Sequence, residues 1–290
     1  MIYRRRATPL HSARAGVGCA YCLALAAAAL IVANPVVLGA VLVATLAAGW
    51  AAGVGRELGR ATAWALPVAL TITLINALVT RDGLTVIVRL GNLPLLGHTD
   101  ITLEATAYGG VLGLRCVALI ACGVLYTTAV DPDEVLRLFR RVSFRSALSA
   151  TLATRLVPIL IRDSRRLADA QRCRPGASPS RLALMRATST GVLDRALDVA
   201  AALEVRGYGA ARQAGSDRAR RAPLSRHDLG FAAAALGIVA IAAVARWGGL
   251  APFSAYPALH APAGPEVLAV AVTLVACALA PFLQRRGVRR

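Results

Sequence analysis

Two arginines near the ends of predicted polar helices are the first residues that could do chemistry. Arg174 lies in DAQRCRPGA (169–177), and Arg206 lies in AALEVRGYGA (201–210). A guanidinium stays charged and offers a planar fork that fits a carboxylate with two hydrogen bonds. An arginine in the last turn of a helix also complements the negative end of that helix. The pattern therefore leaves two interpretations open: ordinary helix ends, or two tips that bind acidic partners.

Other reactive side chains form weaker patterns. Asp194 and Asp198 lie one helical turn apart, but Arg195 between them favours a solvated, salt-bridged helix face. Cys19 and Cys22 have a CxxC spacing inside an apolar run, where no second pair completes a zinc site. The chain also lacks GxxxxGK[ST], HExxH and GxSxG motifs, and all its basic residues are arginines. We therefore predict no metal site and no cofactor, and any ATP is expected to bind to partner subunits.

The elements that position these residues are predominantly apolar. Hydrophobic residues make up 57% of the 290 residues and the mean hydropathy is +0.60, which is typical of a membrane protein. The uncharged run 15–55 would form a helix of roughly 60 Å, about twice the thickness of a bilayer core, so it must fold back, most simply at Asn34-Pro35. The sequence thus predicts an all-α bundle with about six spans: 17–33, 36–53, 61–80, 105–130, 229–245 and 267–284. A cleaved leader at the first run is a weaker alternative, because the apolar run continues into a second span.

The arginines predict the orientation of these spans. If both termini lie on one side, that side collects 29 of the 33 arginines, 19 of them between residues 129 and 228. By the positive-inside rule, both termini and the segment 129–228 are cytoplasmic in a multi-pass protein of the cell membrane. This gives three parts: 1–128 with four spans, the cytoplasmic segment 129–228, and 229–290 with two spans. Arg115 falls inside the fourth span, where an arginine is costly unless it faces protein or water, so we expect a structural or pathway role.

The cytoplasmic segment is predicted to be helical. Asp131 and Pro132 begin a short amphipathic helix, DPDEVLRLFRRV, with Asp133 and Glu134 in its first turn. A second helix is expected from about Ser146 to Arg174, bent at Pro158, and a third from a cap at Ser180 to Arg206. Each long helix therefore ends in an arginine followed by a breaker that contains glycine.

The order of spans, the DPDEVLRLFRRV helix, the TRLVP segment (154–158) and the two arginine tips resemble the transmembrane T component of energy-coupling factor transporters, which includes the CbiQ branch. In that family, two cytoplasmic coupling helices end in Ala-Arg-Gly motifs whose arginines insert into acidic grooves of two ATPase subunits. The resemblance covers nearly the whole chain and places the ATPase-coupling motifs on Cys173, Arg174, Pro175 and Gly176, and on Val205, Arg206, Gly207 and Tyr208. Both arginines are kept, neither alanine is, and Pro175 stands where the first motif has glycine.

The resemblance implies a subunit without catalysis of its own. It implies that the chain transmits the movement of two ABC ATPase subunits to a separate substrate-binding S component, for uptake of a vitamin or a transition-metal ion. Anionic lipid headgroups are expected as further contacts of the basic cytoplasmic segment, and nucleic acid is not, because aromatic residues are few. The alternative is a membrane-embedded enzyme acting on a lipid or an isoprenoid. That enzyme would need the acidic cluster Asp131, Asp133 and Glu134 as its site.

Overall fold

The computed structural model describes residues 8–80, 85–93, 97–139, 144–173, 181–205, 225–256 and 259–283. The chain divides into two compact units. The first, here called the membrane unit, comprises Met1–Val135 and Leu224–Arg290, and the second, here called the paired-helix unit, comprises Leu136–Pro223. The paired-helix unit is thus an insertion between two parts of the membrane unit.

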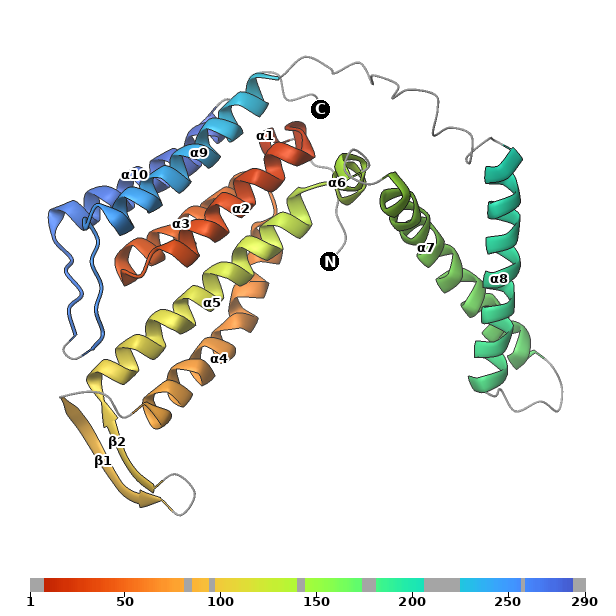
Figure 1. Ribbon diagram of the computed structural model, residues 1–290. Coiled ribbons are helices and arrows are strands. Elements are labelled where there is room, and N and C mark those ends of the chain that lie inside the picture. The colour runs from red at the N-terminus through yellow and green to blue at the C-terminus, as the bar shows by residue number, and fades with distance from the viewer. Residues whose placement is uncertain are drawn as a thin grey trace. The chain divides into compact units, whose positions relative to one another are not determined.

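The membrane unit is a helix bundle (Figure 1). Its helices are α1 (Pro9–Ser12), α2 (Ala15–Ile31), α3 (Pro35–Ala51), α4 (Gly55–Val79), α5 (Leu103–Ala129), α9 (Arg226–Trp247) and α10 (Pro265–Leu283). By length and composition α4, α5, α9 and α10 are able to span a membrane, and α2 and α3 are shorter apolar helices of 17 residues each. Seventeen residues rise about 25 Å, close to the minimum for a span. All six predicted apolar segments are therefore helices, and the predicted all-α membrane bundle is confirmed.

The break between α2 and α3 occurs at the predicted Asn34-Pro35. The Asn34 side chain accepts a hydrogen bond from the Val36 N–H at 3.0 Å, and Pro35 occupies the first helical position of α3. The Asn34 amide also donates to the carbonyl oxygens of Pro252 and Pro262, at 3.3 and 3.2 Å. Because Asn34 is fully buried, this one side chain both begins α3 and fixes the connection between α9 and α10.

The core of the membrane unit is built around α2, which packs against α5 and α9. Small residues line most of it, and three aromatic rings fill its larger space: Tyr21 and Phe231 meet edge to face at 5.3 Å, and Phe231 and Phe282 at 5.2 Å. The Tyr21 hydroxyl donates to the Ala278 carbonyl at 2.8 Å, so its polar end is satisfied inside the bundle. Cys22 is part of this core, which agrees with a thiol acting as a small apolar residue.

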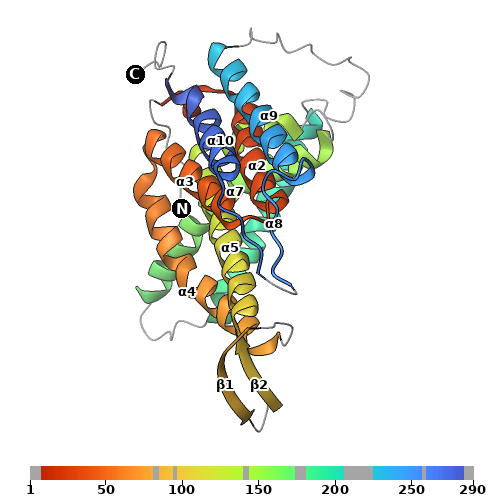
Figure 2. The ribbon, with the colours of Figure 1, turned by 90° about the vertical axis from the view of Figure 1, so that its left-hand side faces the viewer.

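A β-hairpin between α4 and α5 is the main element that the sequence analysis did not predict (Figure 2). Strands β1 (Val86–Leu93) and β2 (Gly97–Thr102) pair antiparallel, with Val86 opposite Thr102. The Thr102 side chain caps α5 by accepting from the Ala105 N–H at 3.3 Å. The buried Glu104 accepts from the Thr85 hydroxyl at 2.9 Å, which joins the base of the hairpin to the first turn of α5. The β-branched run that begins at Thr85 favours a strand, although it is too short to be a span.

Helices α4 and α5 cross at very short range. Gly109 and Gly113 lie on α5 opposite Ala69 and Thr73 on α4, and the Thr73 hydroxyl contacts the Gly109 carbonyl at 3.2 Å. A Cβ atom on Gly113 would lie 2.8 Å from the Ala69 carbonyl oxygen. This small-residue crossing lets the two backbones approach closely, as in other membrane helix pairs.

The paired-helix unit contains two long helices, α7 (Phe144–Arg172) and α8 (Arg181–Val205), which run in opposite directions (Figure 1). The short helix α6 (Pro132–Phe139) precedes them, and its first four residues belong to the membrane unit. Pro158 lies inside α7, where it removes one backbone donor, and the helix continues beyond it to Arg172.

Candidate functional site

The predicted arginine tips fall in the sequence next to the described ends of α7 and α8. Helix α7 ends at Arg172, one residue before the exposed Cys173, and α8 ends at Val205, which is 90% exposed. The other predicted tip residues, Arg174, Pro175 and Gly176 and Arg206, Gly207 and Tyr208, lie outside the described residues.

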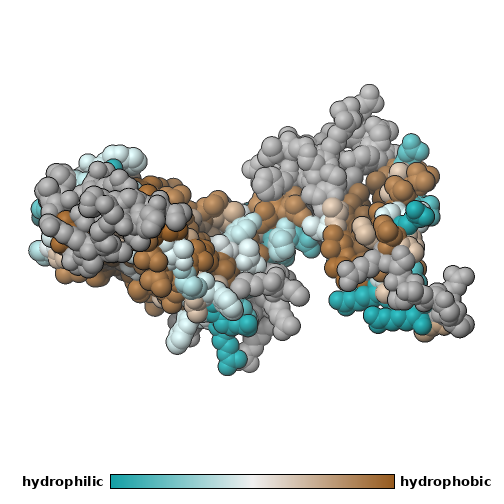
Figure 3. All heavy atoms as spheres, turned by 90° about the horizontal axis from the view of Figure 1, so that it is seen from below, coloured by the Kyte–Doolittle hydropathy of each residue, from teal (hydrophilic) through white to brown (hydrophobic). Residues whose placement is uncertain are grey.

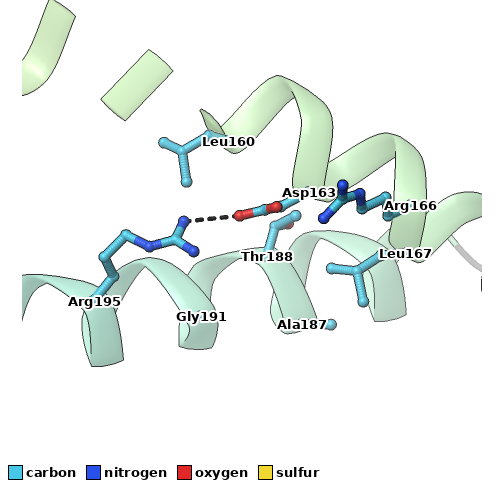
Figure 4. A pocket seen from close by; sticks show the side chains of 8 residues that line it. All are labelled: Leu160, Asp163, Arg166, Leu167, Ala187, Thr188, Gly191 and Arg195. Carbon is cyan, nitrogen blue, oxygen red and sulfur yellow. Dashed lines mark hydrogen bonds and ion pairs between the residues drawn. The ribbon is translucent and has the colours of Figure 1, made fainter. Parts of the chain in front are cut away.

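An ion pair joins α7 to α8 where they cross. The Arg195 guanidinium donates to the Asp163 carboxylate at 2.7 Å (Figure 4). This hydrogen bond lowers the pKa of the Asp163 carboxyl below its ordinary value. Arg195, which the sequence places next to Asp194 and one turn from Asp198, therefore pairs with Asp163 on the other helix. Asp194 and Asp198 are exposed.

Around this pair, side chains of both helices line a cavity of about 380 Å³. Figure 4 shows Asp163 and Arg195 pointing toward each other across it. The lining residues are Leu160, Asp163, Arg166 and Leu167 of α7 and Ala187, Thr188, Gly191 and Arg195 of α8. A Cβ atom on Gly191 would meet no atom within 4 Å, so the helices are not closely packed here. The ion pair is thus a directional contact in an otherwise loose crossing.

We expect Asp163→Asn to loosen the crossing of α7 and α8 without unfolding the protein. A spin label on Cys173, with a second one on Ser189→Cys, should report a broader distance distribution in this variant. Because the pKa of Asp163 is lowered in the folded protein, the contact is present above the ordinary aspartate value of about 4 and weakens as the pH falls through the lowered value. Near neutral pH the distribution should respond to added salt but hardly to pH. The exchanged pair Asp163→Arg with Arg195→Asp should restore the narrow distribution, and a width unchanged in Asp163→Asn would contradict this role.

Helix α8 presents an unusual number of exposed apolar side chains. Four of them, apart from the terminal Val205, fall within about one third of the helix circumference. They are Leu182, Met185, Leu193 and Leu197, each more than 60% exposed. Figure 3 shows hydrophobic residues on the surface of α7 and α8 beside hydrophilic ones. An apolar stripe of this kind next to arginines is typical of a surface that binds a partner.

Arg115 has a defined structural position in α5. Its Nε donates to the Ala29 carbonyl at 3.1 Å, and one Nη donates to the Val32 carbonyl at 2.8 Å. Both carbonyls lie at the C-terminal end of α2, where backbone oxygens lack helical partners and the helix dipole is negative. Arg115 therefore caps α2, which favours its structural interpretation over a place on a transport pathway. The sequence does not identify these partners, because they are backbone atoms of another helix.

The acidic cluster at the start of α6 also has structural contacts. The Asp133 N–H donates to the Asp131 carboxylate at 2.9 Å, and Pro132 occupies the first helical position, as predicted. Glu134 points instead to the N-terminus of α2. These contacts account for Asp131 and Glu134 as helix-capping groups rather than as a converging acid site.

These features define a multi-spanning α-helical membrane protein with an inserted pair of long helices. A family model described as CbiQ, cobalt transport protein, matches residues 6–215, and the chain belongs to this family. The matched residues run from the first described helix past the end of α8 and include both predicted arginine tips. No individual curated protein matches the chain. The chain is thus a membrane-spanning component of a transport system.

Proposed function

We propose that this chain is the coupling subunit of an energy-coupling factor type importer. In this role α7 and α8 hold two ABC ATPase subunits by the tips Arg174 and Arg206 and carry ATPase movement to a substrate-binding membrane partner. The chain itself performs no catalysis, and ATP is bound by the ATPases. The transported substrate is a vitamin or a transition-metal ion, and the substrate-binding partner selects it.

The observation that carries the proposal is the position of the two helix ends. Helix α7, of 29 residues, ends at Arg172, directly before the first motif, and α8, of 25 residues, is described up to Val205, the first residue of the second motif. Cys173 and Val205 are both exposed. An arginine just past a helix end remains charged and can reach a carboxylate groove on a partner with two hydrogen bonds. Family membership makes a transport complex the natural setting for such tips.

The exposed stripe Leu182, Met185, Leu193 and Leu197 supports the same function. Apolar side chains along a charged helix need a partner to cover them, and the ATPases or the substrate-binding subunit would do so. The many arginines between residues 129 and 228 support a cytoplasmic location for these helices and for both termini in the cell membrane, and contact with anionic lipid headgroups.

The test is recruitment of ATPase subunits by the purified protein. Wild type should bring down ATPase subunits and a small membrane protein from detergent extracts. Arg174→Glu and Arg206→Glu should each weaken recruitment by about tenfold or more, and the double variant should abolish it, because reversing the charge of a buried ion pair removes the contact and repels the groove.

Charge reversals elsewhere on the same helices serve as the control. Arg165 on α7 and Arg186 on α8 are exposed, so Arg165→Glu and Arg186→Glu change the net charge equally without touching the tips. These two variants should recruit ATPases as wild type does. If the tip variants also recruit them normally, or if wild type recruits none, the coupling function is wrong and the tips are ordinary helix ends.

A further inference from the structure

Two carboxylates of the membrane unit, one shortly before and one shortly after the inserted unit along the chain, meet at one helix end. Helix α2 begins at Ala15, and its capping residue Arg14 supplies no side-chain hydrogen bond of its own to the helix. Two carboxylates from distant parts of the chain take that place. Asp228 accepts from the Arg14 N–H at 2.8 Å, and Glu134 accepts from the Ala15 N–H at 3.3 Å. Carboxylates at a helix N-terminus are stabilised by its free N–H groups and its positive dipole end.

These two carboxylates bracket the inserted unit along the chain. Glu134 lies two residues before Leu136, where the paired-helix unit begins, and Asp228 lies five residues after Pro223, where that unit ends. The segments just before and just after the insertion are therefore attached to adjacent residues at the start of α2, its capping residue Arg14 and its first residue Ala15. Sequence reasoning assigned Glu134 to its own helix and gave Asp228 no role, since neither contact follows from local spacing.

Asp228 holds more than one element at once. Its second carboxylate oxygen accepts from the Ser225 N–H at 3.0 Å, which closes a capping box on α9, and lies 3.4 Å from the Arg14 Nε. The side chain is only 2% exposed. A buried carboxylate with these partners fixes the first turn of α9 against the start of α2.

Glu134 makes the corresponding attachment for the outgoing chain. The neighbouring Val135 packs against the apolar core, so α6 is seated on the membrane unit at its second turn. Helix α2 is central to that core, and its other end is capped by Arg115 of α5. A displacement at the Glu134 end of α2 would therefore pass along a helix that is held at both ends by charged side chains.

We propose that Glu134 and Asp228 form a clamp that fastens to α2 the two segments of the membrane unit that flank the paired-helix unit along the chain, and so transmits movement of the inserted unit to the bundle. The clamp rests on the proposed coupling function, and its two carboxylates are positioning residues. Without it the covalent connections remain, but α6 is free to move relative to α2. Movement of the ATPases would then be absorbed at the junction instead of reaching the bundle.

The clamp predicts uncoupling rather than loss of assembly. The complex of this chain with its ATPases and substrate-binding partner is reconstituted in liposomes, and substrate uptake is measured per ATP hydrolysed. Glu134→Ala should lower this ratio by about tenfold, the factor expected for a lost hydrogen bond to a charged group, while ATPase recruitment and hydrolysis persist. Glu134→Gln keeps an acceptor oxygen and should recover part of the ratio. Asp228→Asn should lower it as well.

Asp133→Ala is the matched control. Asp133 is the exposed neighbour of Glu134 on the same helix turn, and its substitution should leave the ratio unchanged. The clamp is contradicted if Glu134→Ala keeps the wild-type ratio, or if it lowers thermal stability and ATPase recruitment together, because that result would show a purely structural contact. A wild type that recruits no ATPase would overturn the proposed function, and the coupling role of the clamp with it.

Discussion

Replacing Gly113 with leucine is expected to separate α4 from α5 and to unfold the membrane unit. A Cβ atom at this position would lie 2.8 Å from the Ala69 carbonyl oxygen and 3.2 Å from the Ala69 Cβ. The first contact is with backbone, which cannot rotate away as a flexible side chain can. Adding a single methyl group to a closely packed site costs about 1 to 3 kcal/mol, as in Gly113→Ala. Leucine adds three more carbon atoms than alanine, so its cost is larger. Gly113→Ala should therefore be destabilised and Gly113→Leu should not fold.

Helix α4 has few contacts in the bundle apart from those with α5. It makes most of its contacts with α5, and much of its remaining surface is apolar and exposed, including Trp64, Leu70 and Val79. In a bilayer such a surface gains nothing by leaving lipid for protein, so close backbone packing and the Thr73 contact must supply the association. Loss of the crossing therefore leaves no other large interface for α4 among the described residues.

Size-exclusion chromatography and thermal unfolding in detergent measure this effect. Gly123 is the matched control, because it lies on the same helix and a Cβ atom there would meet nothing within 4 Å. Gly123→Leu should remain monodisperse and keep or raise its melting temperature, since leucine favours a helix over glycine by up to about 1 kcal/mol. The proposed crossing is wrong if Gly113→Leu and Gly123→Leu unfold at the same temperature.

The sequence predicted those features that depend on local chemistry. Asn34-Pro35 combines a capping side chain with a residue that fits the first helical position, and it ends one apolar helix and begins the next. Asp131 and Pro132 signal the start of α6 in the same manner. Uncharged runs gave the six apolar helices, because the bilayer imposes a minimum length that composition reveals directly.

Features that depend on distant contacts were not predictable in the same way. Gly109 and Gly113 carry a small-xxx-small spacing that could have indicated a close crossing, but the spacing does not name Ala69 and Thr73 as its partners. Asp163 and Arg195 are 32 residues apart, and either has oppositely charged neighbours closer along its own helix. Which partner each side chain contacts depends on how α7 and α8 pack against each other. The periodicity of the sequence does not determine that packing.

Substituting methionine for Arg115 is expected to destabilise the protein by removing the cap from α2. Two hydrogen bonds to backbone oxygens would be lost, and hydrogen bonds made by a charged group contribute about 1.5 to 3 kcal/mol each. The Ala29 and Val32 carbonyls would be left without this donor in an apolar interior, where water cannot replace it. Arg115→Lys keeps the charge but loses the planar guanidinium that reaches both oxygens. Its melting temperature should therefore lie between those of the wild type and Arg115→Met.

Thermal unfolding in detergent, measured together with substrate uptake, separates a cap from a pathway residue. Arg246→Met is the matched control: Arg246 is exposed in the last turn of α9, where an arginine contributes at most about 1 kcal/mol through the helix dipole. A cap predicts that Arg115→Met lowers the melting temperature well beyond Arg246→Met and that uptake falls only in proportion to the folded fraction. Unchanged stability with abolished uptake would instead place Arg115 on the path of the substrate. The capping geometry favours the first result, because the guanidinium is held against the end of α2 by two hydrogen bonds, which a substrate would have to break to reposition it.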